Sequence, residues 1–420
     1  MDEQKKTVLH SYHEKEGANM ASFANYDMPL WYPTGVKAEH LAVINSAGIF
    51  DTSHMAAVAV CGEGAREVLQ HCFSKDLDSC IGKNKTPLVS GKCVYGLFLN
   101  PDATVIDDAI VYQLEPQSFM IVVNAGMGAE IAKHMTSSGF EGKFSVEDLT
   151  DRAGKMDIQG PSSAKILKKM IKNPGALFDG LGYFSFKGGF DECNSAVDVE
   201  LLDGTKILVS RTGYTGEFGF ELFVAIDKLE ALWNMFLEAG KEFDLIPCGL
   251  AARDSLRAGA VLPLSHQDVG PWPFLENPWP FAVAWNEDGK SLSKDFIGAE
   301  ALLLETEVDF TLAFAGFDPR KIAASESTYV VDAEGEKIGR ILTCTTDMAI
   351  GRVDGEIVSL VTAEGFKPKG LSCGFILVDR KLAPGDIVYL TDGKRKLKVE
   401  IRVDIRPGRT ARRAIKTMIG

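Results

Sequence analysis

Two adjacent aspartates interrupt an apolar stretch, and they constrain the fold more than any other feature of this chain. Residues 105–112 read VIDDAIVY. The β-branched and aromatic residues on both sides predict a strand that is buried in a sheet. An ionised carboxylate in such a place is costly unless specific groups hold it. The stretch therefore predicts a buried strand that carries a site.

The two carboxylates are not expected to act as one dyad. Neighbouring side chains of a strand point to opposite faces, so Asp107 and Asp108 should meet different surroundings and should not share a proton or bracket one bond. One of them is expected to face a cavity, and the other to have a structural role. In the alternative reading both lie at a strand end after the loop Asn100–Thr104 and accept hydrogen bonds from turn amides.

The composition limits the class of protein. With 420 residues the chain is too long for one ordinary core, which predicts two or three domains. Its 45% hydrophobic and 25% charged residues are typical of a soluble globular protein. The net charge of -13 disfavours a nonspecific nucleic-acid binder, because such a protein needs a basic surface.

The sequence carries no membrane-spanning, secretory or metal-binding signal. It has no run of about 18 or more apolar residues, and the polar N-terminus precedes no apolar segment. We therefore expect a cytoplasmic protein that does not enter a membrane. None of the eight cysteines forms a CxxC pair, and the seven histidines are dispersed. This scatter favours buried, reduced thiols over a metal site.

Short strands and helices alternate without the regular βαβ rhythm of a doubly wound sheet, which predicts an α+β fold. Strands are expected at 56–61, 119–123, 199–202 and 206–210, and helices at 63–72, 128–135, 227–239 and 249–260. The proline-rich segment 271–280 is expected to be an ordered aromatic loop, because its two tryptophans are poorly placed in water. Beyond about residue 306, short strands and turns predict a small all-β domain of sandwich or barrel type.

A glycine-rich segment, RTGYTGEFGFEL at residues 211–222, is a candidate binding loop. Its glycines allow a close approach of the backbone to a ligand, and Tyr214, Glu217 and Glu221 add polar groups. An ordinary hairpin with a glycine turn explains the segment equally well. It is not a phosphate loop, because it lacks the GxxxxGK[ST] pattern and its glutamates would repel phosphate.

Several charged residues are weaker candidates. Arg253 and Arg257 are four residues apart on one helix face and could present two cations to an anionic ligand, although pairing with carboxylates such as Asp254 is commoner. His266 near Asp268 is read either as a catalytic pair or as a loop contact. The basic run at 406–413 is most simply a solvated tail, with a polyanion site as the alternative.

The motifs resemble, in order along the chain, those of the folate-dependent aminomethyltransferase family, which includes the T-protein of the glycine cleavage system. The similar segments are FDTSHM, VYGLFLNPDATVIDDAIVY, IVVNA, IQGP, RTGYTGEFGFEL, PCGLAARDSLRAG and AVAWNEDGKSLSKDFIGAEAL. The resemblance implies an α+β fold with three domains around a central cavity for tetrahydrofolate. It also implies the domain limits: an N-terminal domain with the catalytic aspartate at 1–150, a folate-binding domain at 151–306 and a β-barrel at 307–420.

The resemblance also implies roles for individual residues. Asp107 matches the first aspartate of the family's pair, which positions or activates N5 of the folate, and Asp108 would be structural. The residues that match folate-binding positions are Met55, Tyr95, Val122, Asn124, Tyr214, Glu221, Arg253 and Trp285. Glu221 would accept hydrogen bonds from the pterin, while Arg253 would neutralise folate carboxylates or fix an acidic neighbour. The step would need neither a metal nor a flavin.

The carbon donor is less defined, because the chain departs from the family after the arginine helix and in the aromatic segment that follows. The main reading is an aminomethyltransferase that moves methylene from the aminomethyl-lipoyl arm of H-protein to tetrahydrofolate and releases ammonia. The alternative is a demethylase that moves a methyl group from a small N-, O- or S-methyl donor to tetrahydrofolate. Two further readings are a noncatalytic folate-binding protein, whose KGCYxGQE-like segment is missing, and a detached domain of a sarcosine-type oxidase.

Overall fold

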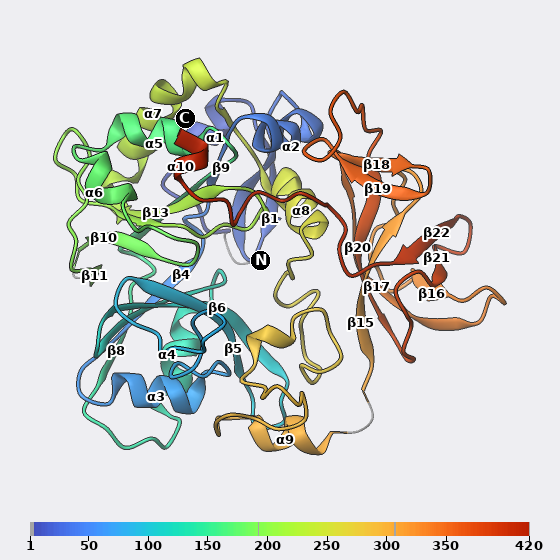
Figure 1. Ribbon diagram of the computed structural model, residues 1–420, viewed down its shortest axis with the longest axis horizontal. Coiled ribbons are helices and arrows are strands. Elements are labelled where there is room, and N and C mark those ends of the chain that lie inside the picture. Colours follow the sequence, from blue (N-terminus) through green and yellow to red (C-terminus); the bar gives the residue numbers. More distant parts are fainter. Residues whose placement is uncertain (1–3, 192, 306–307, 420) are drawn as a thin grey trace.

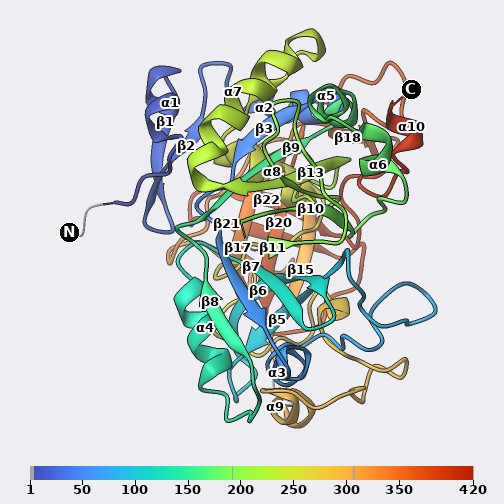
Figure 2. The same ribbon diagram turned by 90° about the vertical axis from the view of Figure 1, so that its left-hand side faces the viewer.

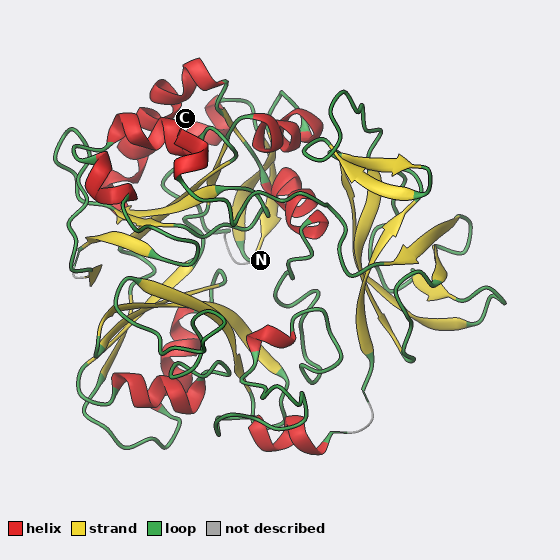
Figure 3. Cartoon of the chain, in the orientation of Figure 1, coloured by secondary structure: helices red, strands yellow, loops and turns green. Residues whose placement is uncertain are grey.

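The computed structural model describes residues 4–191, 193–305 and 308–419. In these residues the chain forms a five-stranded sheet, a seven-stranded sheet and a closed barrel, which make three lobes around a common centre (Figure 1). The barrel lobe is built mainly from strands, whereas the helices gather on the two sheet lobes (Figure 3). This arrangement agrees with an α+β fold that ends in a β-barrel.

The five-stranded sheet carries the aspartate strand. Its order is β5-β6-β7-β4-β8, and the paired neighbours are antiparallel. The strands are β4 (Ala56–Cys61), β5 (Lys92–Leu99), β6 (Val105–Glu115), β7 (Ser118–Val123) and β8 (Ser145–Asp148). Helices α3 (Ala65–Cys72) and α4 (Gly128–Thr136) cover one face, where their apolar residues share a core with β4, β6 and β7. The opposite face of the sheet packs against the second sheet.

The seven-stranded sheet has the order β11-β10-β12-β13-β9-β3-β14. Its strands are β3 (Gly48–Asp51), β9 (Ala153–Gln159), β10 (Phe186–Phe190), β11 (Cys193–Asn194), β12 (Leu208–Ser210), β13 (Gly219–Ala225) and β14 (Ile246–Pro247). Helices α5 (Ser163–Met170), α6 (Pro174–Phe178) and α7 (Leu229–Gly240) bury their apolar faces in the core of this lobe. Because β3 pairs with β9, the chain enters the second sheet before it builds the first.

The barrel closes in the order β15-β20-β17-β16-β21-β22. Its strands are β15 (Phe310–Gly316), β16 (Tyr329–Val331), β17 (Lys337–Asp347), β20 (Leu371–Val378), β21 (Ile387–Thr391) and β22 (Lys396–Ile401), and the hairpin of β18 (Ile350–Val353) and β19 (Glu356–Ser359) lies beside it. The predicted limits 1–150, 151–306 and 307–420 stay a prediction, and the boundary between 306 and 307 lies outside the described residues.

The remaining elements join the lobes. The hairpin of β1 (Asn19–Phe23) and β2 (Tyr26–Trp31) stands with α1 (His10–Lys15) at one edge of the molecule (Figure 2). Helix α2 (Val36–Asn45) packs on α8 (Leu250–Gly259), and α8 also contacts the barrel strand β17. The other elements are α9 (Ala299–Leu304), α10 (Lys416–Ile419) and three short 3-10 helices, η1 (Ile226–Lys228), η2 (Lys241–Phe243) and η3 (Pro280–Ala282).

Two local predictions are wrong. The segment 199–202 forms no continuous strand ladder. Its bridges are two isolated pairs, Leu201 with Ile171 and Glu200 with Lys206, and the second pair closes around a turn at Gly204. The basic run at 406–413 is not a solvated tail. It returns from the barrel to the seven-stranded sheet (Figure 1), and Arg406 on it is completely buried. Buried carboxylates hold this return segment in place.

The proline-rich segment is an ordered aromatic loop, as predicted. Trp279 is 1% exposed, and its Nε1 donates to the carbonyl of Val261. Its ring meets Phe375 of the barrel edge to face, with centroids 5.1 Å apart. Residues of this loop share one apolar core with the ends of β5 and β6 and with the barrel. The loop therefore fixes the barrel against the strand that carries the aspartates.

Candidate active site

A cavity of about 1500 Å³ lies where the three lobes meet. Its walls come from both sheets, from α8, from the aromatic loop, from β17 and from the C-terminal return segment. Ligand pockets of roughly 300–1,000 Å³ already enclose a drug-sized molecule. The cavity therefore has room for a folate-sized ligand and for the end of a second substrate.

Most of the predicted binding residues line this cavity. They are Met55, Tyr95, Val122, Asn124, Tyr214, Glu221 and Arg253. The structure brings them together from β5, β7, β13, α8 and the loops between them. Trp285 is not on the wall, because it is partly buried in the apolar core shared by the aromatic loop and the barrel. The aromatic side chains of Trp279 and Phe281 line the cavity instead.

The aspartate pair is arranged differently from the sequence expectation. Asp107 is completely buried and does not line the cavity, whereas Asp108 does. Asp107 accepts hydrogen bonds from the backbone N–H of Asn124 at 2.8 Å, from its Nδ2 at 2.8 Å and from Ser265 Oγ at 2.8 Å. Asp107 and Asp108 thus have different surroundings, as predicted, but their carboxylates remain close to each other, and the group that faces the ligand space is Asp108.

One amide joins the two carboxylates. Asn124 Nδ2 donates to Asp107 Oδ1 at 2.8 Å and to Asp108 Oδ1 at 2.6 Å, while Tyr95 Oη donates to Asp108 Oδ2 at 2.8 Å. Burial, followed by the negative charge of Asp107, raises the pKa of Asp108 to about 6. A carboxyl group with this pKa can both accept and donate a proton near neutral pH.

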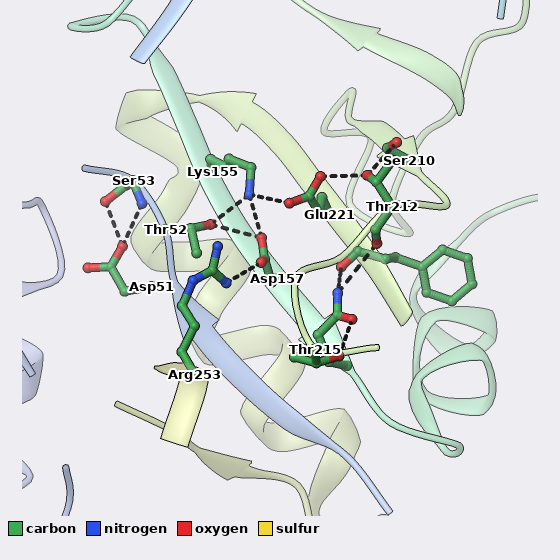
Figure 4. Close-up of polar contacts among 12 residues, drawn as sticks. Asp51, Thr52, Ser53, Lys155, Asp157, Ser210, Thr212, Thr215, Glu221 and Arg253 are labelled. Carbon is green, nitrogen blue, oxygen red and sulfur yellow. Dashed lines mark hydrogen bonds and ion pairs between the residues drawn. The ribbon is translucent and has the colours of Figure 1, made fainter. Parts of the chain in front are cut away.

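Glu221 belongs to a second buried cluster, in which charges are balanced (Figure 4). Lys155 Nζ donates to Glu221 Oε1 at 2.8 Å and to Asp157 Oδ1 at 2.6 Å, and Arg253 donates to Asp157 Oδ2 at 2.7 Å. Burial acts to raise the pKa of Asp157, but the two cations outweigh it and hold that pKa below its ordinary value. The cluster therefore contains two cations and two carboxylates, and Arg253 is already paired.

Lys155 and Asp157 were not among the predicted site residues. Their spacing by two residues in β9 places both side chains on the same face of a strand that is completely buried. Lys155 and Asp157 are charged residues within a buried strand, as Asp107 and Asp108 are in the VIDD stretch. This pattern could have indicated them.

The glycine-rich segment connects β12 and β13, which pair as a hairpin, and it also forms part of the cavity wall. Glycine is favoured at position 213, because a Cβ there would lie 2.3 Å from Oε1 of Gln159, whose side chain is hydrogen-bonded to Phe220 and Thr215. Tyr214 and Glu221 face the cavity, as predicted. Glu217 points away and accepts hydrogen bonds from Arg406 and Thr410. The hairpin reading is therefore correct, and the binding-loop reading stays a prediction.

Of the weaker candidates, Arg257 has a structural partner, and His266 contacts a different residue from the one predicted. Arg257 is completely buried and donates to Asp268, so it does not present a free cation beside Arg253. Asp268 also accepts a hydrogen bond from Thr343 of the barrel. His266 does not pair with Asp268, because its Nε2 lies 3.4 Å from Asp107 Oδ1.

Comparison with known proteins identifies the family. The family model described as the GCVT N-terminal domain matches residues 9–273. The aminomethyltransferase of Caldanaerobacter subterraneus subsp. tengcongensis is 33% identical over 82% of this chain and 84% of its own length. The chain belongs to the aminomethyltransferase family. The family member from Halothermothrix orenii is 30% identical over 94% of this chain and 98% of its own length.

A solved structure of an aminomethyltransferase has the same fold. The glycine cleavage system aminomethyltransferase T from Bartonella henselae superposes with a TM-score of 0.73 at 27% identity, over 95% of this chain and 96% of that one. The predicted family, the α+β fold with a C-terminal barrel and the one-carbon transferase class are confirmed. Within the described part of the chain, every helix is too short or too polar to cross a bilayer.

This aminomethyltransferase should lose stability in mild acid because of His54, which lines the cavity. Burial lowers the pKa of His54 to about 4, and its Nδ1 has no hydrogen-bond partner among the described residues. The unfolded chain binds a proton at this histidine near pH 6.5, whereas the folded chain does so only near pH 4. The neutral imidazole of His54 therefore makes its full contribution to the free energy of unfolding above pH 6.5. This contribution is lost as the pH falls towards 4.

The expected loss is at most about 3 kcal/mol, and denaturant unfolding at pH 7 and pH 4.5 measures it. Other groups titrate between pH 7 and pH 4.5 as well. The loss of unfolding free energy between these two pH values is therefore compared between the parent protein and its His54→Gln variant. The variant should lose less stability than the parent on acidification. Equal losses in the two proteins would show that His54 is not buried in its neutral form.

Proposed function

We propose that the chain is a tetrahydrofolate-dependent aminomethyltransferase that takes a methylene group from the aminomethyl-lipoyl arm of an H-protein. The product would be 5,10-methylenetetrahydrofolate, with release of ammonia. One observation carries the proposal: seven residues that the family motifs predict as folate contacts line a single cavity together with the carboxyl of Asp108. The relatives named as aminomethyltransferases support the reaction class.

The side chains on the cavity wall suit a pterin. Glu221 can accept hydrogen bonds from the ring and amino N–H groups, since a carboxylate offers about four acceptor sites and its present partners do not use all of them. The guanidinium of Arg253 stacks on the ring of Tyr214, with its carbon 4.9 Å from the centroid. Both side chains line the cavity, where the aromatic ring of Tyr214 can pack on a planar ligand ring.

We propose that Asp108 is the group that handles the proton. Tyr95 and Asn124 orient its two oxygens, and the carboxyl borders the space where the reacting atoms would lie. There it can hydrogen-bond a reacting amine, take up or return a proton, and stabilise positive charge that develops during transfer. This proposal replaces Asp107, which the family motif predicts, with its neighbour.

A demethylase remains a second candidate because of the aromatic wall. Trp31, Trp279 and Phe281 line the cavity, and Phe281 lies 6.0 Å from the ring of Tyr95. Aromatic faces attract methylated cations, so a small methylammonium or methylsulfonium donor would suit this wall. The product would then be 5-methyltetrahydrofolate.

A donor panel distinguishes the two candidates. The purified protein and tetrahydrofolate are incubated with aminomethylated H-protein or with small N-, O- and S-methyl compounds, and the folate products are separated. Methylenetetrahydrofolate from H-protein supports the aminomethyltransferase, and methyltetrahydrofolate from a small donor supports the demethylase. Absence of tetrahydrofolate binding by calorimetry would overturn both.

Glu221→Gln should weaken tetrahydrofolate binding about 10- to 100-fold, because a charge-assisted hydrogen bond to the pterin is replaced by a neutral one. Calorimetric titration measures the change in Kd. Tyr112→Phe is the matched control: it removes a hydroxyl 3.3 Å from Glu221 that is completely buried and does not line the cavity. The control should bind folate within about threefold of the parent. Equal losses in both variants would assign Glu221 a structural role only.

A further inference from the structure

His266 has an unusual backbone conformation. Its φ of +62° lies in the left-handed region, which is uncommon for residues other than glycine and in which asparagine, aspartate and histidine are the most frequent of the others. The residue follows Ser265, which donates to Asp107, and precedes Gln267, which donates to the carbonyl of Leu342 in the barrel. His266 therefore lies at the edge of the cavity, between two residues that line it.

The side chain of His266 reaches the buried carboxylate. Its Nε2 lies 3.4 Å from Oδ1 of Asp107, while the histidine itself is 51% exposed to solvent. It is the fourth polar group gathered around Asp107, beside the two N–H groups of Asn124 and the hydroxyl of Ser265. All four can donate to the carboxylate oxygens of Asp107.

We propose that His266, in its protonated form, is a positioning residue that keeps Asp107 ionised, so that the single proton of the aspartate pair resides on Asp108 at the cavity wall. The inference deepens the proposed function, since the proton on Asp108 is the one used in transfer. His266 acts through Asp107 and does not reach the reacting atoms.

The charges around the pair agree with this assignment. Asp107, Asp108 and Glu130 of α4 face the imidazole, while Tyr95 of β5 and Tyr214 of the glycine-rich loop face Asp108. The contact with Asp107 raises the pKa of His266 against the effect of burial. The positive imidazole in turn acts to lower the pKa of Asp108, although burial and Asp107 keep that pKa raised. The two titrations are therefore linked, and each group must report a change in the other.

The first test follows the imidazole of His266 by NMR titration in the protein without folate. In the Asp107→Asn variant the pKa of His266 should fall by about one unit, because an opposite charge within hydrogen-bond reach is removed. The imidazole signals of the other histidines serve as the internal control and should keep their titration curves. An unchanged pKa of His266 in a folded Asp107→Asn protein would overturn the inference.

The second test uses His266→Gly, which relieves the backbone strain and removes only the side chain. Carbon NMR follows both carboxyls: in the parent the Asp108 signal alone should move as the pair takes up its first proton, whereas in His266→Gly the Asp107 signal should move over the same pH range, and the acidic limb of the kcat profile should shift with it. A first protonation confined to Asp108 in the His266→Gly protein would show that His266 does not place the proton of the pair, and that result would overturn the inference. Because the NMR titrations need no folate and no donor, they remain informative even if no transfer activity is found.

Discussion

Asp108→Asn is expected to lower the turnover of one-carbon transfer by about 10²- to 10⁴-fold, the range in which general acid–base groups contribute. Tetrahydrofolate binding should change little, because Asn keeps the shape of the side chain and can still contact Tyr95 and Asn124. Single-turnover transfer from the donor that the panel identifies measures the first quantity, and calorimetry measures the second. The physical reason is the position of this carboxyl, which lines the cavity and has a pKa raised to about 6.

Asp107→Asn provides the contrast, because Asp107 is the residue that the family motif predicts as catalytic. The new amide would place an N–H₂ group among donors that now point at a carboxylate, so we expect a loss of stability of about 1–3 kcal/mol. Turnover should fall less than in Asp108→Asn. If Asp107→Asn abolishes transfer while Asp108→Asn retains it, the sequence assignment is correct and the assignment from the cavity wall is wrong.

Arg406→Ala is expected to destabilise the protein by about 3–5 kcal/mol, because it leaves two buried carboxylates without their cation. Arg406 Nη1 donates to Asp347 of the barrel at 2.6 Å, and its Nε donates to Glu217 of the glycine-rich loop at 3.1 Å. Its backbone N–H donates to the carbonyl of Gly259 at the end of α8. The side chain thus joins the barrel to the wall of the cavity.

Denaturant unfolding at pH 7 measures the effect of Arg406→Ala. Arg413→Ala is the control, because Arg413 lies on the same basic run but its side chain is exposed. The control should stay within about 0.5 kcal/mol of the parent. Equal stabilities of the two variants would show that the return segment is not held by its buried arginine. Tetrahydrofolate binding should also weaken in Arg406→Ala, since Tyr214 lies on the loop that Glu217 helps to fix.

The sequence predicted most of the architecture around the site because local patterns determine it. The helices near 63–72 and 128–135 and the strands near 56–61 and 119–123 follow from the periodicity of apolar residues, and each lies close to its predicted bounds. The sequence motifs also predict the residues of one cavity wall, among them Tyr95, Asn124, Tyr214 and Glu221. What these motifs could not supply is the direction of each side chain.

The positions of the other site residues depend on contacts with residues that are distant in the sequence. Arg406 looked like part of a solvated tail because its carboxylates are 59 and 189 residues away. Asp157 and Lys155 were overlooked because their relation to Glu221 and Arg253 exists only after β9, β13 and α8 have packed together. Trp285 was expected at the cavity, but the core between the aromatic loop and the barrel accommodates it.

The aspartate pair shows which properties of the site follow from the sequence and which follow from the tertiary structure. Alternation along a strand is a local property, so the sequence by itself determined that Asp107 and Asp108 lie on opposite faces and need specific partners. Which face borders the cavity depends on how the first sheet docks against α8, the aromatic loop and the barrel. Only the tertiary structure decided that Asp108 lies on the cavity wall and that Asp107 is enclosed by Asn124, Ser265 and His266.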